Sequence, residues 1–131
     1  MVIFIKKEKM KKISLTLLIV LTLAAILIFG CSKSTLNGTY EGTLPCADCP
    51  GLQTLITFNS DGSFYMKETY LESDVEPIIT EGKWVLSGDI IHFTAGDYKF
   101  EYKLISEKEI RWAPGGQEIT GTNLNWSLFK K

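Results

Sequence analysis

Two cysteines three positions apart are the residues of this sequence best suited to chemistry. Cys46 and Cys49 lie in the segment Leu-Pro-Cys-Ala-Asp-Cys-Pro-Gly, residues 44–51. Two sulfur atoms at this spacing can close a small disulfide loop, exchange disulfides as a redox pair, or supply two thiolates to a soft metal such as Cu(I). The sequence leaves these chemistries open, although export to an oxidising compartment would favour the disulfide.

A metal site built on this pair would have few ligands. Outside the first thirty residues, the other soft or imidazole ligands are Met66 and His92, besides Cys31. Two thiolates could hold Cu(I) in linear coordination, whereas tetrahedral zinc would need both cysteines, the methionine and the histidine to converge. Alternation along their strands predicts that Met66 lies in the core and that His92 is exposed.

The elements that must position these residues are strands. Short segments rich in β-branched and aromatic residues recur after residue 37, and turn signals such as Asp61-Gly62 separate them. In residues 98–105 apolar and charged side chains alternate, so one face of that strand is expected to be buried. The predicted strands are 38–44, 53–58, 63–71, 78–86, 90–94, 98–105, 109–112 and 124–129, with a surface loop at 113–123.

The strand pattern predicts an all-β fold, a small antiparallel up-and-down β-barrel over residues 38–131. Closing a sheet of half-buried strands into a barrel removes its exposed edges. The interior of an eight-stranded barrel is either filled by side chains or holds one small ligand. The sequence does not decide whether the rings of Trp84, Trp112 and Trp126 fill the barrel or line a cavity. The carboxylates are expected on outer faces, where solvent stabilises their charge.

Residues 1–30 are predicted to be a lipoprotein signal peptide with a helical apolar part. Lysines precede seventeen uncharged residues, 13–29, and the following Ile-Phe-Gly-Cys resembles a bacterial lipobox. Cys31 is therefore expected to be acylated, for example with palmitate, and residues 31–37 to form a tether. The alternative is an uncleaved anchor helix. Either arrangement tethers residues 38–131 to a membrane outside the cytoplasm, and either Met1 or Met10 fits as the start.

Composition excludes several classes of function. Residues 31–131 hold nine Lys and Arg against fourteen Asp and Glu, a net charge of −5. Nucleic-acid binding needs a basic face that displaces phosphate counterions, so we do not expect it. With one histidine and no strained serine elbow, a catalytic triad is hard to assemble. A redox catalyst usually places its cysteine at a helix N-terminus, whereas this pair lies between strands. The sequence therefore predicts no enzyme.

The cysteine segment also carries a family resemblance. Residues 38–51, Gly-Thr-Tyr-Glu-Gly-Thr-Leu-Pro-Cys-Ala-Asp-Cys-Pro-Gly, resemble the start of the N-terminal domain of the NlpE family, envelope lipoproteins associated with copper resistance or homeostasis. The resemblance continues through 52–58, 64–70 and the Gly-Lys-Trp at 82–84. It implies a barrel related in shape to bacterial lipocalins, with the cysteine pair at its mouth. One member has a second domain of OB type, for which we expect no counterpart here because the chain ends at Lys131.

Two functions are consistent with these features. The first is a non-catalytic envelope lipoprotein associated with copper homeostasis or envelope-stress sensing, with Cys46 and Cys49 as a disulfide or a Cu(I) site and an envelope-stress sensor protein as partner. The alternative is a lipocalin-like carrier of a small apolar ligand, in which the cysteine pair is a structural disulfide. In a Gram-negative cell, Ser32 after the acylated cysteine resembles the residue of lipoproteins sent to the outer membrane.

Overall fold

The structure, a computed structural model, describes residues 36–131 and, before them, Ile19 alone. The chain divides into two compact units, Met1–Ser34 and Thr35–Lys131. The predicted signal peptide, Cys31 and the tether up to residue 35 therefore lie outside the described residues and stay predictions. Among the described residues, no helix has the length and apolar character needed to cross a bilayer.

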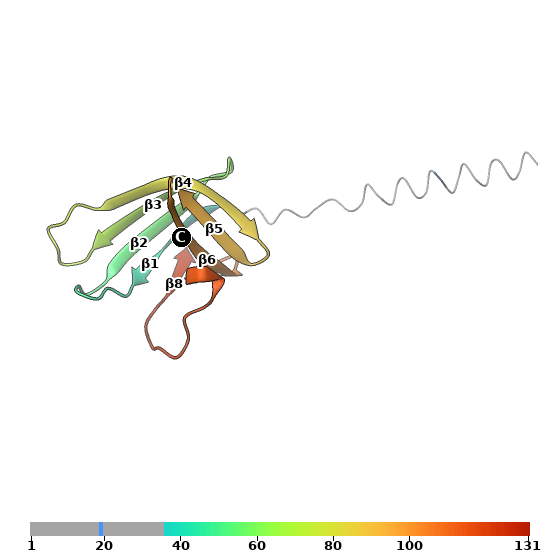
Figure 1. Cartoon of the computed structure of the whole chain (residues 1–131). Coiled ribbons are helices and arrows are strands. Elements are labelled where there is room, and N and C mark those ends of the chain that lie inside the picture. The colour runs from blue at the N-terminus through green and yellow to red at the C-terminus, as the bar shows by residue number, and fades with distance from the viewer. Residues whose placement is uncertain (1–18, 20–35) are drawn as a thin grey trace, which may run out of the picture. The chain divides into compact units, whose positions relative to one another are not determined.

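Within residues 36–131 the fold is a closed antiparallel barrel of eight strands, as the sequence predicts. Each strand pairs with the next along the chain, and β8 pairs with β1 (Figure 1). All strand pairs are therefore between neighbours in the sequence, except the β1–β8 pair that closes the barrel. The strands are β1 Gly38–Leu44, β2 Leu52–Phe58, β3 Ser63–Tyr70, β4 Ile78–Ser87, β5 Ile90–Ala95, β6 Tyr98–Ser106, β7 Glu109–Trp112 and β8 Ser127–Lys130.

The last strand is shorter than the sequence predicts, since β8 begins at Ser127 and not at residue 124. The Asn125 amide group donates to the backbone carbonyl oxygens of Thr43 and Ser127, each at 3.0 Å. Its side-chain oxygen accepts a hydrogen bond from the Ser127 backbone N–H at 3.2 Å. These bonds satisfy backbone groups that a strand ladder would otherwise pair, and they fasten the start of β8 to the end of β1.

The predicted loop at 113–123 contains a short 3₁₀ helix, η1 Pro114–Gly116. Its first anchor is Ala113, which is fully buried and whose backbone N–H donates to the Glu101 carbonyl oxygen at 3.1 Å. The backbone N–H of Gly115 also donates to the Glu101 carboxylate, at 3.3 Å. The beginning of this loop is therefore held against β6.

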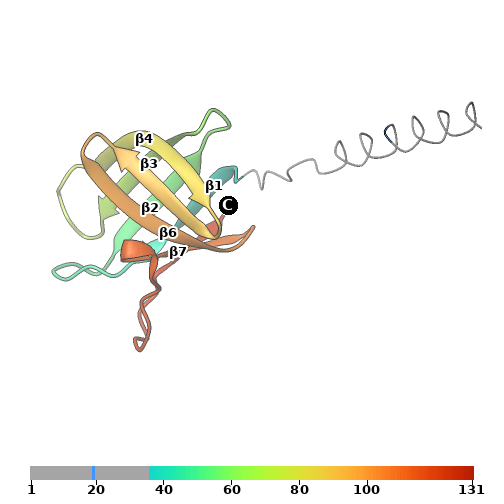
Figure 2. The same ribbon diagram turned by 45° about the vertical axis from the view of Figure 1, so that its right-hand side comes forward.

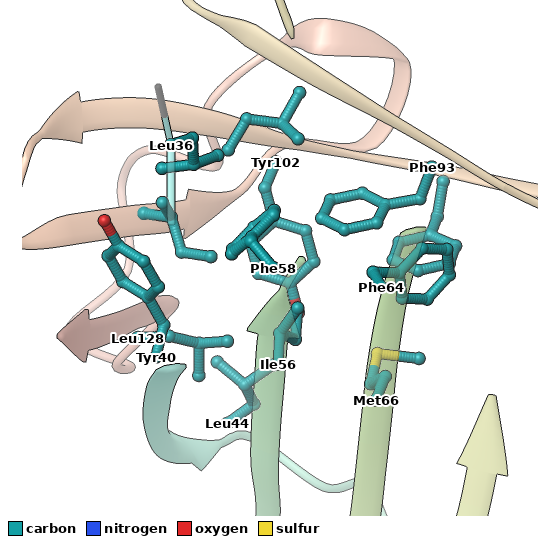
Figure 3. Packing of buried hydrophobic residues seen from close by; sticks show 13 residues of the cluster. Leu36, Tyr40, Leu44, Ile56, Phe58, Phe64, Met66, Phe93, Tyr102 and Leu128 are labelled. Carbon is teal, nitrogen blue, oxygen red and sulfur yellow. The ribbon is translucent and has the colours of Figure 1, made fainter. Parts of the chain in front are cut away.

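The barrel interior is filled over much of its length. Inward-facing rings from seven strands, β1 to β7, pack edge to face, tilted or stacked, with centroids 4.6–6.2 Å apart. Phe93 contacts four of these rings. Figure 3 shows Phe58, Phe64, Phe93 and Tyr102 together, with Met66 below Phe64. The expected burial of Met66 and exposure of His92 are both confirmed. Burial of this cluster is the main favourable contribution to folding.

The two ends of the barrel differ in their connections. Because the strands run alternately up and down, the loop 45–51, the loop 71–77, the turn 96–97 and the segment 113–126 all lie at one end, which we call the mouth. The turns 59–62, 88–89 and 107–108 lie at the other end, together with the start of β1 and the end of β8 (Figure 2). Leu36 is buried there, and the Tyr40 hydroxyl donates to the Glu107 carbonyl oxygen at 2.6 Å. The end where the chain enters the barrel is therefore closed.

Candidate functional site at the barrel mouth

Cys46 and Cys49 form a disulfide bond in the loop between β1 and β2. Their Cα atoms are 5.3 Å apart, within the range that a disulfide can bridge. Both cysteines are half-buried, whereas Ala47 and Asp48 between them are exposed. The bond therefore closes a small loop on the rim of the mouth, where solvent reaches it.

Gly51 fixes the direction in which this loop leaves the barrel. A Cβ atom at this position would overlap the Thr43 side-chain methyl group of β1, so only glycine fits without a shift. The Gly51 carbonyl oxygen accepts a hydrogen bond from the Leu71 backbone N–H at 3.0 Å. The disulfide loop is thereby joined to the loop that follows β3.

An open groove lies between these two loops. Its volume is about 610 Å³, and its walls are formed by the disulfide loop on one side and by residues of the 71–77 loop on the other. Asp48 and Glu72 bring two carboxylates to the groove, and both sulfur-bearing residues line it. Leu52 and Tyr70 form the part of its wall that belongs to the sheet.

A second, smaller cavity lies inside the mouth. Its volume is about 290 Å³, and Pro45 and Leu52 line both this cavity and the outer groove. Its other lining residues come from the inner faces of the strands and from the segment before β8: Leu44, Met66, Glu68, Tyr98, Phe100, Tyr102, Trp112 and Trp126. The sequence does not decide whether the aromatic rings fill the barrel or line a cavity. In the structure they do both, because rings fill one part of the barrel and line a cavity in the other.

The three tryptophans divide in the same way. The Trp84 ring packs edge to face on Phe58 at 5.3 Å, within the filled part. Trp112 and Trp126 line the inner cavity, and Trp112 packs against Tyr102 at 5.2 Å. The indole N–H groups of Trp84 and Trp126 are buried without an acceptor among the described residues.

Glu68 is the ionisable acid of the inner cavity, and its position corrects one expectation. The carboxylates were expected on outer faces, but Glu68 continues the inward series of Phe64 and Met66 along β3. Its carboxyl group has no hydrogen-bond or salt-bridge partner among residues 36–131. Burial raises the pKa of this carboxyl, because the low-dielectric surroundings disfavour its charged form. Its period-two spacing after Phe64 and Met66 was the signal that could have revealed it.

Two tyrosines face this carboxyl group. Burial, and then the nearby Glu68 charge, raise the pKa of Tyr98 and of Tyr102. Both phenols are therefore neutral over the physiological range and can act as hydrogen-bond donors or acceptors. Tyr98 is 55% exposed at the rim, whereas Tyr102 is fully buried. Sequence reasoning placed both on the inner face but did not connect them with Glu68.

The structure does not bring the remaining soft ligands to the disulfide. His92 lies on the outer face of β5, where its Nδ1 atom is 3.9 Å from a carboxylate oxygen of Glu101. Met66 lines the inner cavity, whereas Cys46 and Cys49 line the outer groove. Among the described residues, no group of three or more His, Cys, Asp or Glu could hold a metal ion. A tetrahedral site from these four side chains is therefore not formed.

The chain is similar in sequence to known proteins. The model of the NlpE N-terminal domain family matches residues 40–122. The 17 kDa lipoprotein of Treponema pallidum is 37% identical over 108 residues, covering 72% of this chain and 69% of that protein. Lipoprotein NlpE of Escherichia coli is 36% identical over 58 residues, covering 43% of this chain and 25% of its own length. This chain thus matches about a quarter of the Escherichia coli protein.

Solved structures show the same barrel. A crystal structure from Shewanella oneidensis, described as that of a lipoprotein, superposes with a TM-score of 0.62 at 33% identity and covers 74% of this chain and 89% of its own. The crystal structure of the Cpx pathway activator NlpE from Escherichia coli superposes with a TM-score of 0.58 at 27% identity. The superposed part makes up 65% of this chain and 46% of the Escherichia coli chain.

Proposed function

Because this chain belongs to the NlpE N-terminal domain family, we propose that it is a non-catalytic envelope lipoprotein with a role in copper homeostasis and envelope-stress sensing. Acylated Cys31 would anchor it to the membrane, in a Gram-negative cell to the outer membrane on its periplasmic side. The relatives are named lipoproteins and not enzymes, which supports a non-catalytic role. A relative is described as an activator of the Cpx pathway, which supports an envelope-stress sensor as partner.

The observation that carries this proposal is the position of the half-buried Cys46–Cys49 bond on the rim of the mouth, where it lines an open groove. In the oxidised protein the bond holds the loop closed. In the reduced protein the same two sulfur atoms would be thiolates at short spacing, and soft thiolates select Cu(I). Because no further cysteine, histidine or methionine lines the groove among the described residues, two-coordinate Cu(I) suits the pair better than zinc does. Oxidation and copper binding would then act on the same rim, which a partner protein could contact.

A thiol count and a Cu(I) titration test this function on the full chain. We expect protein taken directly from the envelope to have Cys46 and Cys49 bonded. Under copper stress, chains that arrive in the envelope with reduced thiols should bind Cu(I) and release the thiol protons before the pair is oxidised, so that part of the protein has masked thiols. The purified chain, reduced and kept without oxygen, should bind one Cu(I) per molecule. Replacing both cysteines with serine should abolish this binding while leaving the barrel folded, with a loss of stability of about 2 kcal/mol for so short a loop.

Asp48→Asn provides the matched control, since it changes the same exposed loop and keeps both sulfur atoms. This variant should bind Cu(I) as the unaltered chain does. Equal copper binding by the double serine variant would refute the metal function.

The inner cavity favours a second candidate, the carrier of a small ligand. Eight-stranded barrels that hold one ligand do so in their mouths, and pockets of a few hundred Å³ lined by aromatic and aliphatic side chains are typical of such sites. The cavity of about 290 Å³ meets this description. In this function the disulfide would fix the rim of the cavity.

A further inference from the structure

The walls of the inner cavity combine aromatic rings with one carboxyl group. Phe100, Tyr102, Trp112 and Trp126 contribute ring surfaces, and Glu68 contributes the acid. The faces of aromatic rings carry partial negative charge and attract cations, most strongly for tryptophan. A carboxyl group without a partner in such surroundings is costly when ionised, because burial removes its hydration. An arriving positive charge would offset that cost.

The charged side chains that line the outer groove and the inner cavity have one sign. Among the described residues that line the inner cavity and the outer groove, the charged side chains are Glu68, Asp48 and Glu72, with no lysine, arginine or histidine. Asp74 and Glu76 add two acidic residues to the loop that bounds the groove. A cleft lined by charges of one sign concentrates ligands of the opposite sign. The mouth therefore favours cations and disfavours anions such as fatty acids.

The ligands available exclude a metal ion as the preferred cation. Calcium and magnesium take six or more oxygen ligands, and one carboxylate with two phenols does not provide them. Ring faces and alkyl side chains suit instead a cation that carries its own apolar surface. From this composition we propose that the inner cavity binds a small organic ammonium compound, with the ring faces around the cation and Glu68 as its counter-ion. The inference sharpens the carrier function by naming the class of ligand.

Three probes of nearly the same shape isolate the effect of charge. Choline carries a quaternary ammonium group, 3,3-dimethylbutan-1-ol replaces its nitrogen by carbon, and 3,3-dimethylbutanoate carries a negative charge instead. We expect choline to bind at least about tenfold more tightly than the neutral alcohol, and the anion not to bind. NMR titration of the full chain in detergent micelles measures this at the indole N–H signals. Those of Trp112 and Trp126 should shift, while that of Trp84 stays in place.

Glu68→Gln tests the counter-ion with little change of shape. It should lower choline affinity to that of the neutral alcohol and leave the affinity for the alcohol unchanged. Glu81→Gln is the matched control, because it removes one negative charge from an exposed position on the neighbouring strand β4. This variant should bind choline as the unaltered chain does. A merely structural role of Glu68 would change the binding of both probes alike.

Phosphocholine separates a lipid headgroup from a free ammonium compound. Its phosphate would meet the acidic rim, so we expect weaker binding than for choline, and tighter binding would identify a phospholipid headgroup as the occupant. Equal affinity for choline and the neutral alcohol would overturn the ammonium site and leave the carrier function standing. Absence of binding by all three probes would overturn both.

Discussion

At the scale of single residues, two glutamates show how position decides the behaviour of one functional group. Glu109 accepts hydrogen bonds from the Ser127 hydroxyl at 2.7 Å and from the Arg111 guanidinium at 2.9 Å. These two hydrogen bonds lower the pKa of Glu109, and the bond from Ser127 has the larger effect. Burial without a hydrogen-bond partner raises the pKa of Glu68 instead. The Glu109 carboxylate therefore stabilises the fold, whereas the Glu68 carboxyl group is available to bind a ligand.

Replacing Glu109 by glutamine should remove part of the pH dependence of stability. A carboxyl whose pKa is lowered by folding stabilises the protein above its ordinary pKa of 4.5, and this stabilisation is lost as the pH falls through the lowered value. Below about pH 5, the free energy of urea unfolding should therefore fall more steeply with pH in the unaltered chain than in the Glu109→Gln variant. Glu81→Gln is the control and should keep the original slope. Identical slopes in all three proteins would contradict the assigned role.

At the scale of elements, the rim of the mouth is built from two connections that hold each other. The close approach of Gly51 to Thr43 sets the path of the β1–β2 loop, and the hydrogen bond from Leu71 joins it to the β3–β4 loop. The disulfide lies between these fixed points. Both the outer groove and the entrance to the inner cavity therefore depend on how closely the loop packs on the end of β1.

Gly51→Ala should destabilise the barrel by about 1–3 kcal/mol, since the added methyl group overlaps the Thr43 methyl group. Thr43→Ser removes that methyl group and keeps the hydroxyl that donates to the Gln53 side-chain oxygen at 2.9 Å. The double variant should recover most of the lost stability, which chemical denaturation measures in a double-mutant cycle. Additive losses in the cycle would show that this contact does not set the path of the loop.

At the scale of the whole molecule, the barrel is filled toward the end where the chain enters and hollow at its mouth. The rings around Phe93 occupy the filled part, while the inner cavity begins beyond them at Leu52 and Glu68. Close packing makes the first part the main source of stability. The mouth can therefore vary in sequence and bind ligands at small cost to the fold.

Two truncations test this division. Phe93→Ala should cost about 3–5 kcal/mol, because it leaves a void among four packed rings. Leu52→Ala should cost less than about 2 kcal/mol, because this side chain is half-buried and already borders open space. Equilibrium denaturation of the two variants measures both values. Equal losses would show that the mouth contributes as much packing as the filled part.

The sequence alone determined the number and order of the strands, the barrel class and the place of the cysteine pair between the first two strands. Period-two alternation, turn residues and a short spacing are local signals, which neighbouring residues impose without the rest of the chain. The start of β8 was misplaced because Asn125 bonds to the end of β1, far away in the sequence.

Only the tertiary structure decided which inward side chains share a layer of the barrel. Glu68, Tyr98 and Trp126 come from β3, β6 and the segment before β8, and the ladder registers together with the closure of β8 on β1 bring them to one cavity. Alternation says that a side chain faces inward, but its depth depends on the stagger between strands, which no single strand encodes. The division into a filled part and a hollow mouth follows from that stagger.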